Sequence, residues 1–238
     1  MQEKIIPLKK TARLAGFLFL WLIITGLTGA LTISNIVGSA PFEETAKRVA
    51  NSERLYRLAL CSELIETLSA LVLAFALYTI LKPVNKLLAQ MAMYWRLAES
   101  LVGCVGVIFS FAQLNVYISV QTTGEDRSQL QSLADFTHHA GFAFYNISAL
   151  CFSIGSTLFF YLFLKSEYIP KVLSVFGMFA SVIVTIMCFG SLIFPEYSQM
   201  LQYGWAPMAI AEVTTGFWLM FGTLNRRSTT TQNSAAFI

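Results

Sequence analysis

The sequence predicts an all-α fold: a polytopic membrane protein, built as a bundle of six transmembrane helices. Only 12% of the 238 residues are charged and 56% are apolar, which leaves too little charge to cover a water-facing surface. The mean hydropathy is +0.64, and the apolar residues fall in blocks long enough to cross about 30 Å of hydrocarbon as helices. This composition excludes a soluble enzyme, a nucleic-acid-binding protein and a disordered chain.

Six apolar stretches are the predicted spans, because helices satisfy their own backbone hydrogen bonds in lipid. They are residues 12–37, 54–81, 87–120, 136–165, 172–194 and 205–224. Prolines punctuate the loops between them, and Pro207 falls in the first turn of the last span, where proline is tolerated. The polar third loop, residues 121–135, is a candidate for a short surface helix.

Residues 1–227 are predicted to form a single six-helix transmembrane domain, followed by a short, polar, disordered tail over residues 228–238. The first apolar block follows four basic residues, as in a signal peptide. Its apolar core is too long for one, and further spans follow, so we interpret it as a retained first helix.

Lysines and arginines set the predicted orientation, because cytoplasmic loops of membrane proteins carry an excess of them. Ten lie in the N-terminal segment, the second and fourth loops and the tail, against five around the remaining loops. The first loop, with Lys47, Arg48, Arg54 and Arg57, weakens this bias without reversing it. We therefore expect both termini in the cytoplasm.

The candidate site residues are those that a bilayer should exclude, since a charge at the centre of a span costs roughly 3 kcal/mol. Within or at the ends of the apolar stretches lie Glu63, Glu66, Arg96, Glu99, His138, His139 and Glu212. The pairs Glu63/Glu66 and Arg96/Glu99 are each spaced by three residues, so the members of each pair share a helix face.

Two interpretations of these faces stay open. Small and polar residues continue them, such as Gly103 and Gly106 in the third span and Gly216 in the sixth, and such residues let membrane helices pack closely. Packing explains the charges less well, because four glutamates against Arg96 leave three negative charges without compensation. Some carboxyls must then be protonated, or a cation must bind near them. The structural alternative pairs Arg96 with Glu99 and leaves the other glutamates neutral.

The histidines and cysteines give no metal signature. His138 and His139 are adjacent, so their side chains point about 100° apart on a helix, and we expect at most one of them to face the site. There is no HExxH or CxxC motif. The four cysteines lie in four different spans, as expected of small buried residues. We expect no metal, no cofactor and no catalytic residue among them.

Several motifs resemble those of the bacterial multi-span membrane protein family "domain of unknown function 4386". They are the run Leu77-Tyr78-Thr79-Ile80-Leu81-Lys82-Pro83-Val84-Asn85-Lys86, Trp95-Arg96-Leu97-Ala98-Glu99, His138-x-x-Gly141-Phe142, Ser166-Glu167-Tyr168-Ile169-Pro170, and Glu212 with Gly216-Phe217-Trp218-Leu219. The resemblance covers residues 12–225 and implies a six-helix fold in the inner (cytoplasmic) membrane. It implies an acidic residue, usually Asp, where this chain has Glu63.

The functional expectation is a protein that binds or transports a small solute or a cation at the seven candidate residues, coupled to protons, with the lipid bilayer as its surroundings. Two alternatives remain: an intramembrane enzyme that uses a histidine with the carboxylates, and an accessory or sensory subunit without turnover. Enzyme activity is the less favoured expectation, and no nucleic acid is expected as a partner. The sequence specifies neither the solute nor an oligomeric state.

Overall fold

A computed structural model describes residues 5–122 and 126–222, and this part of the chain is helical almost throughout, without strands. The elements in chain order are α1 (Ile5–Val37), α2 (Phe42–Asn51), α3 (Glu53–Leu81), α4 (Lys86–Thr122), α5 (Arg127–Ser166), α6 (Lys171–Ile193), the 3₁₀ helix η2 (Pro195–Tyr197), α7 (Ser198–Leu201), the 3₁₀ helix η3 (Gln202–Gly204) and α8 (Trp205–Phe221). The all-α prediction is confirmed. The tail predicted to be disordered, residues 228–238, lies outside the described residues.

Five helices in the described part are long and apolar enough to cross a membrane: α1, α3, α4, α5 and α6. They correspond to the first five predicted spans and make this a multi-pass membrane protein by length and composition. The sixth predicted span coincides with α8, which has 17 residues. At about 1.5 Å per residue it is roughly 25 Å long, slightly shorter than a straight crossing needs. The count of six spans is therefore not confirmed.

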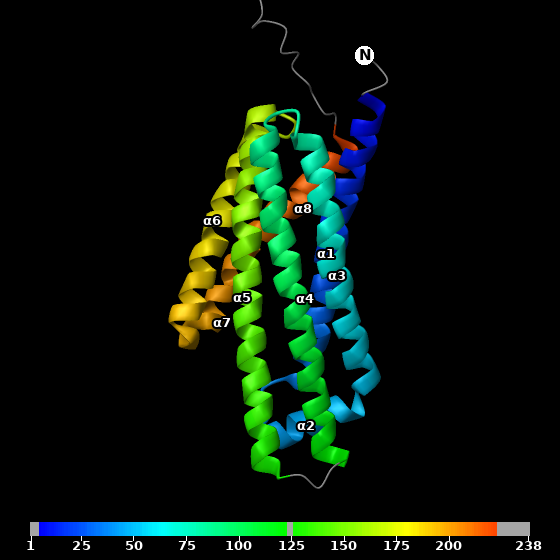
Figure 1. The fold of residues 1–238 in the computed structure, drawn as a ribbon, viewed down its shortest axis with the longest axis vertical. Coiled ribbons are helices and arrows are strands. Elements are labelled where there is room, and N and C mark those ends of the chain that lie inside the picture. Colours follow the sequence, from blue (N-terminus) through cyan, green and yellow to red (C-terminus); the bar gives the residue numbers. More distant parts are fainter. Residues whose placement is uncertain (1–4, 123–125, 223–238) are drawn as a thin grey trace, which may run out of the picture.

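The long helices run up and down the bundle (Figure 1). The start of α1, the α3–α4 turn and the α5–α6 turn lie at one end, and α2 lies at the other. The most extensive packing is between α4 and α5, followed by α1 against α3. From the end of α6 the chain returns through α7 into α8, which packs against α1 and α6.

The loops at the α2 end differ from the prediction. The first loop contains α2, a helix that the sequence analysis did not anticipate, whose buried side chains are Thr45, Ala46 and Val49. Conversely, the surface helix expected within residues 121–135 is not separate. From Arg127 onward these residues form the first turns of α5, because the Asp126 side chain accepts a hydrogen bond from the Ser128 amide and caps that helix.

Two apolar cores form along the bundle. The larger core joins α1, α3, α4, α5, α6 and α8 toward the N-terminal end, with Leu73, Ile80 and Phe163 almost fully buried. A second core, around Val49, Leu60 and Leu114, joins α2 to the ends of α1, α3, α4 and α5. Along α3 and α4, the charged candidate residues Glu63, Glu66, Arg96 and Glu99 lie between the residues of one core and those of the other.

Turn chemistry accounts for two of the family-like motifs. The Asn85 side chain accepts a hydrogen bond of 3.0 Å from the Leu88 amide, which caps the start of α4 after Pro83 ends α3. Glu167 adopts the left-handed conformation (φ 55°) that ends α5. The Trp218 indole of α8 donates to the Tyr168 carbonyl in that same turn, at 3.3 Å. The residues of these two motifs thus form the turns between α3 and α4 and between α5 and α6.

Candidate functional site

Arg96 is the centre of the candidate site. It lies on α4 about 15 Å from Lys86 at roughly 1.5 Å per residue, a distance equal to half the thickness of a hydrocarbon core of about 30 Å. Its side chain is only 3% exposed. A charge at this depth requires compensation from the protein, because lipid supplies none.

Glu99 supplies part of that compensation, as the three-residue spacing predicts. Arg96 Nε lies 3.1 Å from Glu99 Oε2, and the Glu99 side chain is 16% exposed. The two atoms are in ion-pair contact, but the N–H does not point at the oxygen. Arg96 Nε, Arg96 Nη1 and Glu99 Oε2 thus make no hydrogen bond with any residue that the structure describes. The two charges of the pair balance each other, but several of its polar atoms lack hydrogen-bond partners among the described residues.

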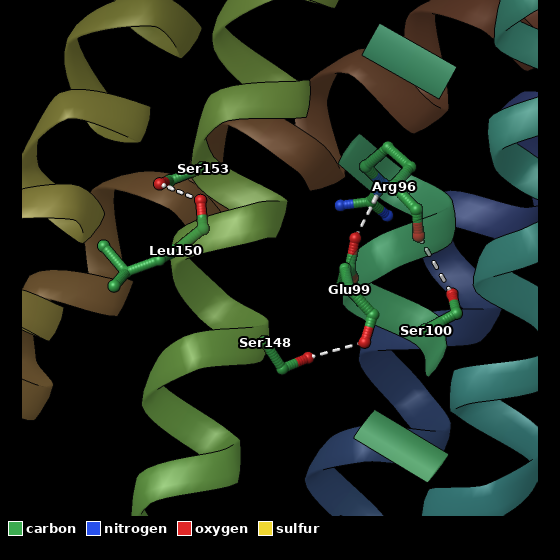
Figure 2. Close-up of polar contacts among 6 residues, drawn as sticks. All are labelled: Arg96, Glu99, Ser100, Ser148, Leu150 and Ser153. Carbon is green, nitrogen blue, oxygen red and sulfur yellow. Dashed lines mark hydrogen bonds and ion pairs between the residues drawn. The ribbon is translucent and has the colours of Figure 1, made fainter. Parts of the chain in front are cut away.

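Helix α5 provides the opposite wall. The guanidinium carbon of Arg96 lies 4.5 Å from the centre of the Phe152 ring, a cation–π contact. Ser148 donates a 2.9 Å hydrogen bond to the Glu99 backbone carbonyl, which fastens α5 to α4 beside the pair (Figure 2). Gly155 makes room for the arginine: a methyl group there would lie 3.0 Å from Arg96 Cγ.

Glu66 and Glu63 lie on α3 and face α1, where glycines accommodate them. A methyl group on Gly26 would lie 2.7 Å from Glu66 Oε1, and one on Gly29 would lie 3.1 Å from Glu63 Cγ. In the same interface the Ser62 hydroxyl donates to the Thr25 backbone carbonyl at 2.9 Å. The α1–α3 interface is therefore a close backbone approach that holds two carboxyl side chains against α1.

Glu212 joins the group from α8. It interacts electrostatically with Arg96, Glu66 and Glu99, and Glu66 also interacts with Arg96. Helix α8 reaches this position because it crosses α1 at two glycines: a methyl group on Gly216 would lie 3.1 Å from the Gly16 carbonyl oxygen. Arg96, Glu66, Glu99 and Glu212, which we call the interior charge cluster, thus come together from α3, α4 and α8. Glu63 lies at its edge and interacts with Glu66.

A small cavity adjoins Arg96 on the side of the larger core. Its volume is about 10 Å³, which is room for about one water molecule. Besides Arg96 it is lined by Phe19, Leu77, Ser156, Phe159, Phe160 and Phe163. A water there would lie within a mostly aromatic wall, with the guanidinium and the Ser156 hydroxyl as its polar neighbours.

The histidines are not part of this group. His138 and His139 are both exposed, with ring centres 5.9 Å apart, and His139 Nδ1 lies 2.7 Å from the Asp135 carbonyl oxygen. They are about 14 Å along α5 from Ser148, because His139 precedes Ser148 by nine residues at roughly 1.5 Å per residue. In the described residues, no group of three or more His, Cys, Asp or Glu side chains could hold a metal ion.

Several contacting residues were not singled out by the sequence analysis: Phe152 and Gly155 on α5, and Gly16, Gly26 and Gly29 on α1. The glycines had a signal, since they recur on α1 at spacings of ten and three residues and small residues mark close helix contacts. Phe152 had none, because a phenylalanine in an apolar helix is indistinguishable from one facing lipid.

Fold and site together define a class: an all-helical membrane protein with ionisable residues from several helices in its interior. The chain belongs to the family described as Domain of unknown function (DUF4386), which matches residues 14–222. The resemblance noted in the motifs is therefore confirmed. No curated protein and no solved structure shows a significant match to the chain.

Proposed function

We propose that this protein binds a small cation, or a small solute with a cationic group, at the interior charge cluster and moves it across the membrane in exchange for protons. The observation that carries the proposal is the cluster itself: one guanidinium with incompletely satisfied hydrogen-bonding groups contacts Glu99 and interacts electrostatically with two further carboxyls, Glu66 and Glu212, from two other helices. Intramembrane ionisable residues in such groups mark ion and substrate pathways in membrane proteins.

The charge balance favours a cationic ligand. Glu66, Glu99 and Glu212 together with Arg96 carry two excess negative charges when all are ionised, and a low-dielectric interior does not tolerate them unpaired. Protons neutralise the excess when the site is empty. A bound monovalent cation takes the place of one of these protons and releases it, which couples the two movements.

The surroundings of the Arg96 guanidinium are those that a cationic ligand requires. Its guanidinium has a carboxylate oxygen at 3.1 Å and an aromatic ring at 4.5 Å, which is the pair of contacts that organic cations receive in binding sites. We therefore assign Arg96 as an internal cation that holds the empty site closed. Its withdrawal from Glu99 opens the site to the ligand.

The finer topology belongs to the same proposal: six spans including α8, both termini in the cytoplasm, and the inner (cytoplasmic) membrane as the location. In support, Lys82, Lys86, Lys165 and Lys171 gather with the start of α1 at one end of the bundle (Figure 1). At the other end Arg48, Arg57 and Arg127 are paired with Glu44, Glu53 and Glu43.

The binding test is a thermal-shift series on purified protein in detergent, with sodium, guanidinium and tetramethylammonium chloride at equal ionic strength. A site ligand raises the melting temperature in a saturable way, since it binds only the folded state. Glu212→Gln is expected to abolish the shift. Glu196→Gln is the matched control, because Glu196 is an exposed glutamate outside the cluster, and it should keep the shift.

The transport test uses the same variants in liposomes that contain a pH-sensitive dye. A gradient of the cation that shifts the melting temperature should drive proton movement in the opposite direction, and Glu212→Gln should stop it. Binding without flux would reduce the proposal to a binding protein. No saturable shift with any of the three cations would reject it.

A second candidate function, an accessory subunit without turnover, is favoured by one observation. The cavity beside Arg96 has room for only about one water, so the cluster is closely packed in this conformation. This candidate expects a fixed Arg96–Glu99 pair and no response to cations, and the thermal-shift series therefore separates the two.

A further inference from the structure

The segment between α6 and α8, residues 194–204, has a repeat of three that the proposed function does not use. After Phe194 it consists of the 3₁₀ helices η2 and η3 with the single α-helical turn α7 between them, and over this short length every third side chain lies on about the same face. Three faces of different chemistry result. We call them the apolar, polar and inward faces of this segment.

The apolar face is exposed to an unusual degree. It consists of Phe194, Tyr197, Met200 and Tyr203, which are 53%, 57%, 70% and 80% exposed. The polar face, Glu196, Gln199 and Gln202, is exposed as well. An amphipathic surface of this kind, with aromatic residues on one side and polar residues on the other, is typical of segments that lie in a membrane interface.

The inward face fastens the segment to α6. A methyl group on Gly190 would lie 3.0 Å from Leu201 Cδ1, and one on Gly204 would lie 3.3 Å from Met187 Cβ. The chain therefore folds back on the last turns of α6, and the apolar face turns away from the protein. It continues an exposed apolar strip on α6 that includes Ile186, Phe189 and Ile193.

The level of the segment agrees with a membrane boundary. Helix α6 has 23 residues, so at about 1.5 Å per residue its far end lies roughly 35 Å from Lys171, close to the thickness of the hydrocarbon core. On α5, the Lys165 ammonium lies over the Tyr161 ring at 4.8 Å, and Tyr145 contacts Trp205 at a ring distance of 6.3 Å. These tyrosines are about 24 Å apart along the helix and mark two aromatic belts.

We propose that Phe194, Tyr197, Met200 and Tyr203 insert into the headgroup region of the bilayer and fix the depth of the bundle, so that the α2 end stands in water beyond them. The occupant of the apolar face is thus lipid. A second copy of the chain would cover α6 and this segment together, but the polar face directly beside the apolar one suits a lipid–water boundary better than a continuous protein interface.

The α2 end has the properties of a part that projects from the membrane. Helices α4 and α5 have 37 and 40 residues, about 55 and 60 Å, and exceed the hydrocarbon core by more than 20 Å. Figure 1 shows α6 and α7 ending part-way along α5, well short of α2. The projecting part, which we call the head, has its own apolar core and carries an exposed ion pair between Arg127 and Glu43.

The test places nitroxide labels on single cysteines in a cysteine-free chain, reconstituted in phosphatidylcholine/phosphatidylglycerol liposomes. The positions are Met200→Cys on the apolar face, Gln202→Cys as the matched control on the polar face, Val182→Cys on exposed mid-α6 and Ser132→Cys in the head. Accessibility to oxygen, which dissolves in lipid, is compared with accessibility to a water-soluble nickel chelate.

The expected order of the oxygen-to-nickel ratio is Val182, then Met200, then Gln202 and Ser132, with several-fold steps and a water-like value at Ser132. If the ratio at Met200 equals that at Gln202 and Ser132, the segment lies in water and the proposal fails. A lipid-like ratio at Ser132 would equally reject it, because the head would lie inside the bilayer. If Met200→Cys does not fold, Tyr203→Cys against Gln199→Cys repeats the comparison on the same two faces.

Discussion

At the scale of single residues, the structure shows how one arginine is kept in an apolar interior. Arg96 is compensated by a carboxylate, stacked on Phe152 and given space by Gly155. The contacts lower the cost of burial without removing it, because Nε and Nη1 still lack hydrogen-bond partners among the described residues. Such a group is expected to be sensitive to the loss of either partner.

Replacing the arginine tests this sensitivity. Arg96→Leu is expected to lower the free energy of unfolding in detergent by about 3–5 kcal/mol, because Glu99 is left as an unpaired buried charge. The double variant Arg96→Leu with Glu99→Leu should recover part of that loss, as in a double-mutant cycle. Arg57→Leu is the control, since the Arg57–Glu53 pair is 43% and 40% exposed and is worth about 1 kcal/mol or less.

Equal thermal stability of the wild type and Arg96→Leu would show that the pair does not compensate charge. A double variant less stable than the single one would point to a different partner for Glu99.

At the scale of elements, glycines decide which helices carry the site. Gly26 and Gly29 allow α1 to approach α3 closely enough to hold Glu66 and Glu63 between them, and Gly16 and Gly216 allow a close approach of α1 and α8.

Helix α2 is held by apolar contacts rather than by glycines. It was not predicted because it is short and strongly charged, and it contributes Ala46 and Val49 to the second core, with Phe42 packed against them.

Gly16→Ala is expected to destabilise the protein, because the added methyl group would lie 2.5 Å from the Gly216 carbonyl oxygen, a backbone atom that moves only if α8 moves away from α1. Gly141→Ala is the control: nothing lies within 4 Å of its added methyl group, so the better helix propensity of alanine should stabilise α5 by up to about 1 kcal/mol. Melting curves of both variants make the comparison, and a Gly16→Ala variant as stable as Gly141→Ala would contradict the contact.

A charged residue introduced into the buried face of α2 tests how α2 is held against the bundle. Ala46 is fully buried, so Ala46→Glu places an unpaired charge in the second core and should detach α2 at a cost of a few kcal/mol. Limited trypsin digestion at Lys47 and Arg48 is the measurement, and cleavage should become much faster. Lys47→Glu, an exposed change on the same helix, should leave the rate at Arg48 nearly unchanged. Protection of Arg48 in Ala46→Glu would mean that α2 is held by other contacts.

At the scale of the whole molecule, the bundle has two unlike ends. One gathers lysines around short turns, and the other projects as the head, where Arg48, Arg57 and Arg127 are paired with glutamates. Because the orientation depends on lysines and arginines near the ends of the spans, the lysine end is expected in the cytoplasm.

Cysteine labelling in intact cells tests that orientation. In a cysteine-free chain, Val84→Cys in the α3–α4 turn should react with a membrane-impermeant maleimide only after the cells are opened. Asp126→Cys and Gln199→Cys should react from the outside. Labelling of position 84 in intact cells would reverse the topology and with it the side on which the head lies.

The sequence by itself determined the class of protein, the five long apolar helices and the positions of the charges along them, because each depends on local composition and on the fixed rise of a helix. Its three-residue spacing also predicted the Arg96–Glu99 pair. Only the tertiary structure decided which charges meet. Glu66 and Glu212 lie on helices that approach through glycines distant in sequence, whereas His138 and His139 lie in the head, beyond the level that an apolar stretch alone would indicate. Packing across the bundle sets how far polar residues extend a helix and which distant faces meet. Small residues in one helix indicate that a close contact exists, but they do not specify which helix makes it.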